Sequence, residues 1–259
     1  MATFDAEAAA RWVAEQHAAR AAYANLPAEL APNSLDEAYA AQDALQDIWS
    51  TRYGRIAGAK IATTTKVMQA LMGIDHPCGG AIFERRIHTS PATIARGDYV
   101  NVMIECELAV RLVIDLAARA EPWTRDSVRN AISTVMPAFE LIEDRHAVYR
   151  ETKALSLIAD NAWNAGIVLG RPVTVAPAAP LDGLEGRLTV NGGDEKSGRT
   201  DDPLGALAWL ANLAASRGRP LKAGQVIITG SVIPTIPVKA GDRLSFTLGG
   251  LGEVALTVT

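Results

Sequence analysis

Apolar and polar positions alternate with different periods in the two parts of this sequence. Over residues 5–23 and 35–53, apolar side chains recur every three or four positions among charged ones, as in amphipathic helices. Ser34 and Glu37 form a capping-box pattern at the start of the second stretch, and Gly54 marks its end. We therefore expect two helices in residues 1–54, joined by a proline-containing linker.

From about residue 55 the pattern changes to short, glycine-punctuated runs rich in β-branched residues, which predict strands. Thr124 is an expected N-cap of a helix that runs to about residue 135, and Asp202 with Pro203 predicts a helix that ends before Gly218. The expected fold class is α+β. A helical portion of residues 1–54 packs with a largely β domain of residues 55–259 as one unit.

Composition excludes several classes of protein. The net charge is −4, whereas a nucleic-acid binder usually carries a basic stripe. No apolar run reaches the roughly 18 residues needed to cross a bilayer, and the N-terminus shows no signal-peptide pattern. The two cysteines, Cys78 and Cys106, form no disulfide framework. We therefore expect a cytoplasmic protein without nucleic-acid or membrane partners.

The segment VMIECELAV places two carboxylates inside an apolar run. Residues i and i+2 of a strand project from the same face, so Glu105 and Glu107 lie side by side and Cys106 points to the core. Like charges this close require either a proton on one of them or a cation between them. Carboxylates favour a hard ion such as Mg²⁺ or Ca²⁺. The pair taken alone favours the other alternative, the solvated face of an edge strand.

Two further polar residues occur in apolar surroundings. Glu140 lies in the strand-like segment MPAFELIEDRH, close enough along the chain for its strand to neighbour the first pair, and it predicts a third metal ligand. Lys60 lies in GAKIATTT, where an apolar setting can lower the pKa of a lysine and suit it to acid–base chemistry. The alternative for Lys60 is a surface side chain whose ammonium stays in water.

Several segments together resemble the fumarylacetoacetate hydrolase superfamily, and within it the branch of 2-oxopent-4-enoate hydratases and 4-oxalocrotonate decarboxylases. The matching segments run from about residue 58 to the C-terminus, in the order GAKIATTTKVMQALMGIDHP, IECELA, PAFELIEDR, IADN, PLGALAWLAN and ITGS. The resemblance implies a fumarylacetoacetase-like mixed β-sheet roll. It also implies homo-oligomers built from dimers.

The resemblance assigns roles to particular residues. Glu105, Glu107 and Glu140 would bind Mg²⁺, or Mn²⁺ or Ca²⁺ at the same site, and Lys60 would take part in acid–base catalysis. The expected substrate-site residues are Thr64, Cys78, Asp160, Asn161, Gly230 and Ser231. The implied substrate is a small 2-oxo or 2-hydroxydienoic acid of aromatic meta-cleavage catabolism.

The sequence also departs from the family pattern. Cys78, in DHPCGG, stands where hydratases carry a second aspartate, and Trp163, in DNAW, replaces a small residue. A hydratase is the favoured function, and the missing aspartate predicts weak hydration of 2-hydroxypenta-2,4-dienoate. A 4-oxalocrotonate-type decarboxylase, an acylpyruvate-type C–C hydrolase and a non-catalytic partner subunit are the alternatives.

Overall fold

The computed structural model describes residues 4–176 and 178–259, so residues 1–3 of the expected N-terminal portion lie outside the described part. The helices are α1 (Ala6–Ala18), α2 (Leu35–Tyr53), α3 (Lys66–Met72), α4 (Arg125–Arg129), α5 (Ala154–Ala159) and α6 (Pro203–Ser216). The strands are β1 (Ile56–Ala62), β2 (Cys78–Phe83), β3 (Ile87–Thr89), β4 (Ala92–Ile94), β5 (Val102–Leu112), β6 (Ile132–Glu143), β7 (Asn164–Leu169), β8 (Glu185–Val190), β9 (Asp194–Arg199), β10 (Val226–Pro237), β11 (Arg243–Leu248) and β12 (Glu253–Val258).

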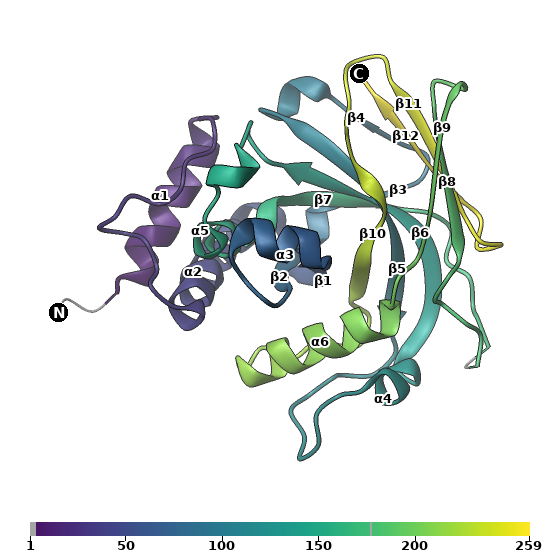
Figure 1. Cartoon of the computed structure of the whole chain (residues 1–259), viewed down its shortest axis with the longest axis horizontal. Coiled ribbons are helices and arrows are strands. Elements are labelled where there is room, and N and C mark those ends of the chain that lie inside the picture. The colour runs from purple at the N-terminus through teal and green to yellow at the C-terminus, as the bar shows by residue number, and fades with distance from the viewer. Residues whose placement is uncertain (1–3, 177) are drawn as a thin grey trace.

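The strands form two mixed sheets. The larger sheet has seven strands in the order β2-β1-β10-β5-β6-β7-β3, and the smaller has five in the order β4-β12-β11-β8-β9. The long strands β5, β6 and β10 curve through the middle of the molecule, with the five-stranded sheet on one side and α1, α2 and α5 on the other (Figure 1). The expectation of an α+β fold with a mixed β-sheet roll is confirmed.

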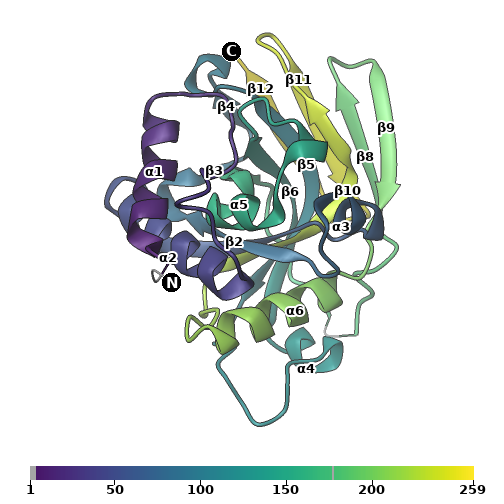
Figure 2. The same ribbon diagram turned by 60° about the vertical axis from the view of Figure 1, so that its left-hand side comes forward.

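The largest core lies between the two sheets. Alternate residues of β5, among them Ile104, Cys106 and Leu108, join this core, and Phe139 of β6 packs on Phe246 of β11 with ring centroids 6.1 Å apart. The intervening residues of β5 face the other side of the sheet, where the helices pack (Figure 2). The period of two along β5 therefore separates an apolar face from the face that carries Glu105 and Glu107.

The N-terminal helices pack against one another and against α5. Ala9, Ala10 and Val13 of α1 share a buried cluster with Ala41 and Leu45 of α2. The buried amide of Gln42 in α2 donates to the carbonyls of β2 and α5, which fixes this helical portion to the rest of the chain. The domain boundary after residue 54 remains a prediction.

Two predicted helices end earlier than expected. The first helix ends at Ala18 instead of continuing to residue 23, because Arg20 turns with a φ of 54° and the N–H of Tyr23 donates to the carbonyl of Arg145. The helix after Thr124 ends at Arg129 instead of residue 135, because the β-branched residues that follow pair with β5. Pairing within the sheet outweighs the weak helix propensity of such residues.

The predicted bounds of the other two helices, α2 and α6, are confirmed. The Ser34 hydroxyl accepts a hydrogen bond from the N–H of Glu37, and Gly54 follows the last residue of α2. The Glu37 carboxylate accepts from the N–H of Asn33 and not from that of Ser34, so only half of the capping box forms. Asp202 caps α6, with Pro203 in the first turn.

Candidate metal and substrate site

Three carboxylates meet on the helix-facing side of the seven-stranded sheet. Antiparallel pairing sets Glu105 of β5 directly opposite Glu140 of β6, and Glu107 lies two positions along β5. One ligand oxygen from each of the three carboxylates lies within 4.8 Å of the others. The predicted convergence of the three acids is confirmed. We call these residues the carboxylate cluster.

Backbone and side-chain donors hold each member of the carboxylate cluster. The N–H of Gly230 donates to Glu107 Oε2 over 2.6 Å, and the amide of Asn164 donates to Glu140 Oε1 over 2.8 Å. The hydroxyl of Thr235 donates to Glu105. These donors orient the carboxylates but leave other oxygens in the cluster free.

Two oxygens of the carboxylate cluster are buried without a hydrogen-bond partner. They are Oε1 of Glu107 and Oε2 of Glu140, and both side chains are fully buried. Buried charged oxygens without partners are costly, so most are paired or bound to a cation. A set of neighbouring carboxylates with two unpaired oxygens matches the chemistry of a hard divalent ion. The residues present therefore fit such an ion.

Protons and a divalent ion would compete for the carboxylate cluster. Burial, together with the neighbouring charges of Glu140 and Glu105, raises the pKa of Glu107 well above its usual range. Burial also raises the pKa of Glu140 to about 7, although the ammonium of Lys60 opposes the shift. A cluster without a cation therefore takes up protons near neutral pH.

Lys60 belongs to this arrangement. It lies on β1, its side chain is 2% exposed, and its Nζ is 3.1 Å from Glu140 Oε1. Burial disfavours the ammonium, but the charges of Glu140 and Glu105 outweigh this effect and raise the pKa of Lys60. The expectation of a lowered pKa is wrong, because the ammonium is paired with acids. The alternative of a solvent-exposed lysine is excluded.

A cavity of about 480 Å³ opens beside Lys60 and Glu105. We call it the carboxylate cavity. Thr64, Gly230 and Ser231 line it, so three of the predicted substrate-site residues lie at its wall. Its full lining comprises Lys60, Ile61, Ala62, Thr63, Thr64, Thr65, Val67, Met68, Met72, Glu105, Ile142, Tyr149, Leu157, Ala162, Trp163, Gly230, Ser231, Val232, Ile233, Pro234 and Thr235.

The other three predicted substrate-site residues lie behind the wall of this cavity. Cys78 is fully buried; Thr63 donates a hydrogen bond to its thiol, and burial raises the pKa of that thiol. The Asp160 carboxylate is paired with Arg145 over 2.7 Å and with His17 over 2.6 Å. Cys78, Asp160 and Asn161 are therefore not among the residues that line the cavity, and their roles towards a substrate remain predictions.

Asn161 supports a strained turn. Asn161, Ala162 and Trp163 are consecutive residues with φ between 47° and 60°, a left-handed conformation that costs roughly 1–2 kcal/mol for each non-glycine residue. The Asn161 amide donates to the carbonyl of Ala81 over 2.9 Å and accepts from its N–H over 2.7 Å, as a strand neighbour would. These bonds hold the turn, which presents Ala162 and Trp163 to the carboxylate cavity.

Sequence reasoning missed several residues of the site. Asn164 and Thr235 donate to the carboxylate cluster, and Tyr149 lines the carboxylate cavity. Asn164 is the polar residue of the otherwise apolar strand β7, the same signal that identified Lys60 and Glu140. Thr235 lies in β10, which also contains Thr229 and Ser231, so the sequence did not distinguish it. No sequence feature distinguished Tyr149, which lies in a short 3-10 turn.

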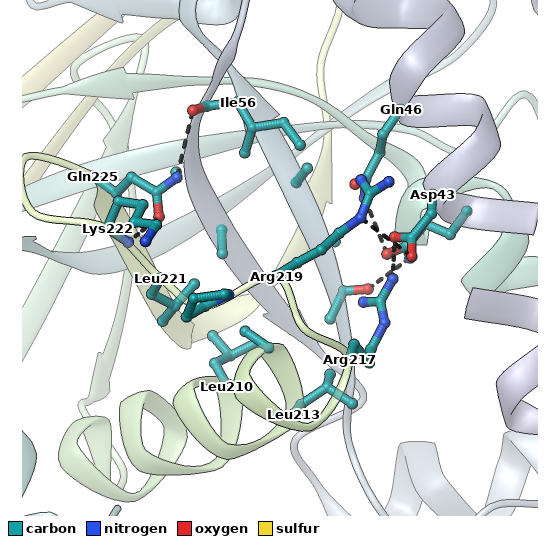
Figure 3. A pocket seen from close by; sticks show the side chains of 18 of the residues that line it. Asp43, Gln46, Ile56, Leu210, Leu213, Arg217, Arg219, Leu221, Lys222 and Gln225 are labelled. Carbon is teal, nitrogen blue, oxygen red and sulfur yellow. Dashed lines mark hydrogen bonds and ion pairs between the residues drawn. The ribbon is translucent and has the colours of Figure 1, made fainter. Parts of the chain in front are cut away.

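A second hollow of about 600 Å³ lies between α2, α6 and the strands β1 and β2. We call it the α2–α6 groove. Figure 3 shows Arg217 and Arg219 reaching from the end of α6 towards Asp43 of α2. Lys222 also lines the groove and pairs with Asp115 over 3.0 Å. Its cations are thus occupied by acids, unlike the oxygens of the carboxylate cluster.

Comparison with known proteins defines the family. The family model described as fumarylacetoacetate (FAA) hydrolase C-terminal matches residues 83–259. The chain therefore belongs to the fumarylacetoacetate hydrolase family, as the sequence motifs indicated. It is 32% identical over 256 residues to 2-keto-4-pentenoate hydratase 1 of Dechloromonas aromatica, covering 96% of this chain and 95% of the relative.

Other relatives extend this result. The chain is 32% identical over 231 residues to 2-oxo-hept-4-ene-1,7-dioate hydratase of Escherichia coli, covering 86% of each chain. Its fold matches the structure of 4-oxalocrotonate decarboxylase from Pseudomonas putida G7, complexed with magnesium and adipate, with a TM-score of 0.89. That alignment has 24% identity and covers 98% of this chain and 97% of the other.

Proposed function

We propose that this protein is a divalent-metal-dependent hydratase of a 2-hydroxydienoic acid. The observation that carries the proposal is the carboxylate cluster. Its Glu105 and the paired Lys60 line the carboxylate cavity, and one buried oxygen each of Glu107 and Glu140 has no hydrogen-bond partner. The similarity to hydratases over most of the chain supports the reaction class. Aromatic meta-cleavage catabolism is the expected metabolic setting.

Glu105, Glu107 and Glu140 are the residues that would hold the ion. Mg²⁺ is our first choice because it favours carboxylate oxygens, and Mn²⁺ or Ca²⁺ would use the same residues. A bound divalent ion would supply a Lewis acid that stabilises negative charge on the 2-oxo oxygen of the substrate. The donors from Gly230, Asn164 and Thr235 keep the three carboxylates in place before the ion arrives.

The reaction consists of proton transfers and the addition of one water. The dienol loses the proton of its 2-hydroxyl group and gains one at C5, which gives a 2-oxo acid with a double bond between C3 and C4. Water then adds its oxygen at C4 and a proton is delivered to C3, so that the product is a 4-hydroxy-2-oxo acid. No oxidant or reductant is needed.

Lys60 is the residue we place in these proton transfers. Its ammonium lines the carboxylate cavity, and its raised pKa keeps it protonated at neutral pH. It is therefore suited to hold and return a proton, or to hydrogen-bond a developing negative charge. Thr64 and Ser231 line the same cavity and are our candidates for orienting the substrate or its water.

Decarboxylation is the second candidate. The absence of an aspartate at Cys78 favours it, because decarboxylation uses the same stabilised enolate but adds no water. A C–C hydrolase would also use that enolate. We further expect a cytoplasmic homo-oligomer built from dimers, and in the described residues no helix has the length and apolarity that a bilayer crossing requires.

The direct test is loss of the ultraviolet absorbance of 2-hydroxypenta-2,4-dienoate on adding the full chain, with Mg²⁺ or with a chelator. Metal-dependent loss with formation of 4-hydroxy-2-oxopentanoate is the expected result. Release of CO₂ from 4-oxalocrotonate, without hydration of the dienoate, would instead identify a decarboxylase. No reaction with either compound at any metal concentration would point to a non-catalytic partner subunit.

A further inference from the structure

The charged and the aromatic residues that line the carboxylate cavity lie on different sides of it. Lys60, Thr64 and Glu105 come from the sheet side and surround the place where a 2-oxo acid would bind. The helical side, formed by α3, α5 and the turns around them, contributes apolar and aromatic side chains. These are Val67, Met68, Met72, Tyr149, Leu157, Ala162 and Trp163.

The apolar wall is part of one packed cluster. Met72, Leu157 and Trp163 are buried members of the hydrophobic cluster that also contains Ile142, and Met68 and Tyr149 pack against it. Trp163 meets Tyr149 edge-to-face with ring centroids 5.4 Å apart. On its other side it meets Tyr23 in the same manner at 5.1 Å. The indole is therefore held in a defined position at the cavity wall.

The cavity offers no free cation for a second carboxylate. Among the described residues that line it, Lys60 and Glu105 are the only charged ones, and Lys60 is paired with Glu140. Arg145 is a nearby arginine behind the aromatic wall, where it contacts the ring of Tyr23, but it is buried and paired with Asp160. A carboxylate at the distal end of a substrate would lose hydration on the apolar wall without gaining a cation as partner. The unpartnered indole N–H of Trp163 is a neutral donor, which does not replace an ion pair.

The cavity is also larger than the shortest substrate requires. Its volume of about 480 Å³ falls within the range of roughly 300–1,000 Å³ that is typical of sites for drug-sized ligands. A five-carbon dienoate held at the carboxylate cluster would leave the wall formed by Met68, Leu157 and Trp163 uncovered.

Building on the proposed function, we propose that the substrate is a 2-hydroxydienoic acid with an uncharged apolar tail beyond C5, and not a dicarboxylate. Trp163 is the specificity-determining residue, because its indole lines the cavity and is held rigidly there between Tyr23 and Tyr149. Met68, with its flexible side chain, adapts the wall to the shape of the tail. The relatives include hydratases of both monocarboxylates and a dicarboxylate, so similarity alone does not decide between them.

The first experiment measures binding without requiring turnover. Two saturated 2-oxo acids of similar shape are compared by calorimetry in the presence of Mg²⁺: 2-oxo-7-methyloctanoate and 2-oxoheptanedioate, in which a carboxylate replaces the terminal isopropyl group. We expect the neutral-tailed acid to bind at least about tenfold more tightly, since a buried unpaired carboxylate is strongly disfavoured. Equal binding, or tighter binding of the diacid, would overturn the inference.

The second experiment alters the wall. Trp163→Ala should reduce the affinity ratio of the neutral acid to the diacid by about tenfold, whereas Trp163→Phe should retain most of it. Met68→Lys supplies a cation at the partly buried edge of the wall and should shift the ratio towards the diacid. Val113→Ala, an exposed apolar residue outside the cavity, is the matched control and should leave the ratio unchanged. If neither Trp163→Ala nor Met68→Lys changes the affinity ratio of the neutral acid to the diacid, the assignment of this wall to the substrate tail is contradicted.

The third experiment separates this inference from the proposed function. Values of kcat/KM are compared for 2-hydroxy-7-methylocta-2,4-dienoate and 2-hydroxyhepta-2,4-diene-1,7-dioate, and a preference of at least about tenfold for the former is expected. If the neutral 2-oxo acid binds preferentially but neither dienoate is consumed, the tail preference stands and the hydratase proposal fails. If neither 2-oxo acid binds with Mg²⁺ present, both fail.

Discussion

The carboxylate cavity and the α2–α6 groove are hollows of comparable size, about 480 and 600 Å³, but their polar groups differ in kind. In the groove, Arg217 and Arg219 are satisfied by Asp43 in an exposed or half-buried setting. In the carboxylate cluster beside the cavity, Glu107 and Glu140 are fully buried and each keeps an oxygen without a partner. Unsatisfied buried carboxylate oxygens, rather than volume, are therefore the reason for choosing the cavity as the candidate functional site.

The strongest test of this contrast replaces one acid of the carboxylate cluster and one acid of the groove. Glu107→Gln should lower kcat/KM by about 10³-fold or more, because it weakens the binding of an ion whose Lewis acidity supplies several kcal/mol. Asp43→Asn in the groove only breaks partly solvated ion pairs and should change kcat/KM by less than about threefold. Steady-state kinetics and Mg²⁺ calorimetry measure both effects. Similar losses in the two variants would remove the distinction between the hollows.

The next test concerns the cation of the cavity. Lys60→Ala should lower kcat by about 10²-fold, as expected for a positioned acid–base group, while Mg²⁺ still binds. Lys196→Ala, an exposed lysine on β9, serves as the control and should keep full activity. Unchanged turnover in Lys60→Ala would exclude this residue from the proton transfers.

Asn161 lies between the two hollows. Its side chain forms hydrogen bonds with Ala81 and Gln46, which line the groove, and the turn that it holds lines the cavity. Asn161→Ala should lower the free energy of unfolding by about 2–3 kcal/mol, because buried partners lose their hydrogen bonds. Urea denaturation measures the change. Asn130→Ala on the surface should cost less than about 0.5 kcal/mol, and an equal cost in both variants would contradict the supporting role of Asn161.

The next prediction concerns the thiol of Cys78, which stands where related hydratases carry an aspartate. We expect slow hydration of 2-hydroxypenta-2,4-dienoate by the natural chain, because a neutral thiol offers no fixed negative charge. Cys78→Asp should raise the rate by about tenfold, and Cys78→Ser, which adds no charge, should not. Fast hydration by the natural chain that Cys78→Asp does not improve would show that the proton comes from another group.

The smallest expected effect is the pH dependence of metal stabilisation. Burial raises the pKa of both Glu107 and Glu140, so their protonation stabilises the metal-free fold fully below the unfolded value near 4.3. This contribution is lost as the pH rises through the folded pKa values, which is about 7 for Glu140. Mg²⁺ takes the place of these protons, so the rise in Tm on adding it should be at least about 2 °C larger at pH 8 than at pH 6. Calorimetry with and without a chelator measures the difference. A larger rise at pH 6 would contradict the assignment of protons to the cluster.

Much of the fold and the site follows from local pattern. The period of two along a strand predicted that Glu105 and Glu107 share a face opposite Cys106, and the capping residues Ser34 and Asp202 correctly marked where α2 and α6 begin. Local rules failed where distant segments compete for the same residues. The helix after Thr124 is shorter than predicted because the residues that follow it pair with β5.

Other features depended on the tertiary structure alone. Only the register of β5 on β6 sets Glu140 opposite Glu105, and only that proximity raises the pKa of Lys60 instead of lowering it. Chain folding also placed Asp160 against Arg145 and His17, behind the cavity it was expected to line. The sequence by itself determined which side chains carry charge and which face of a strand they occupy, because these properties depend on residue type and backbone period. Which charges become neighbours was decided by strand pairing between segments far apart in the chain, and pKa values follow from those neighbours.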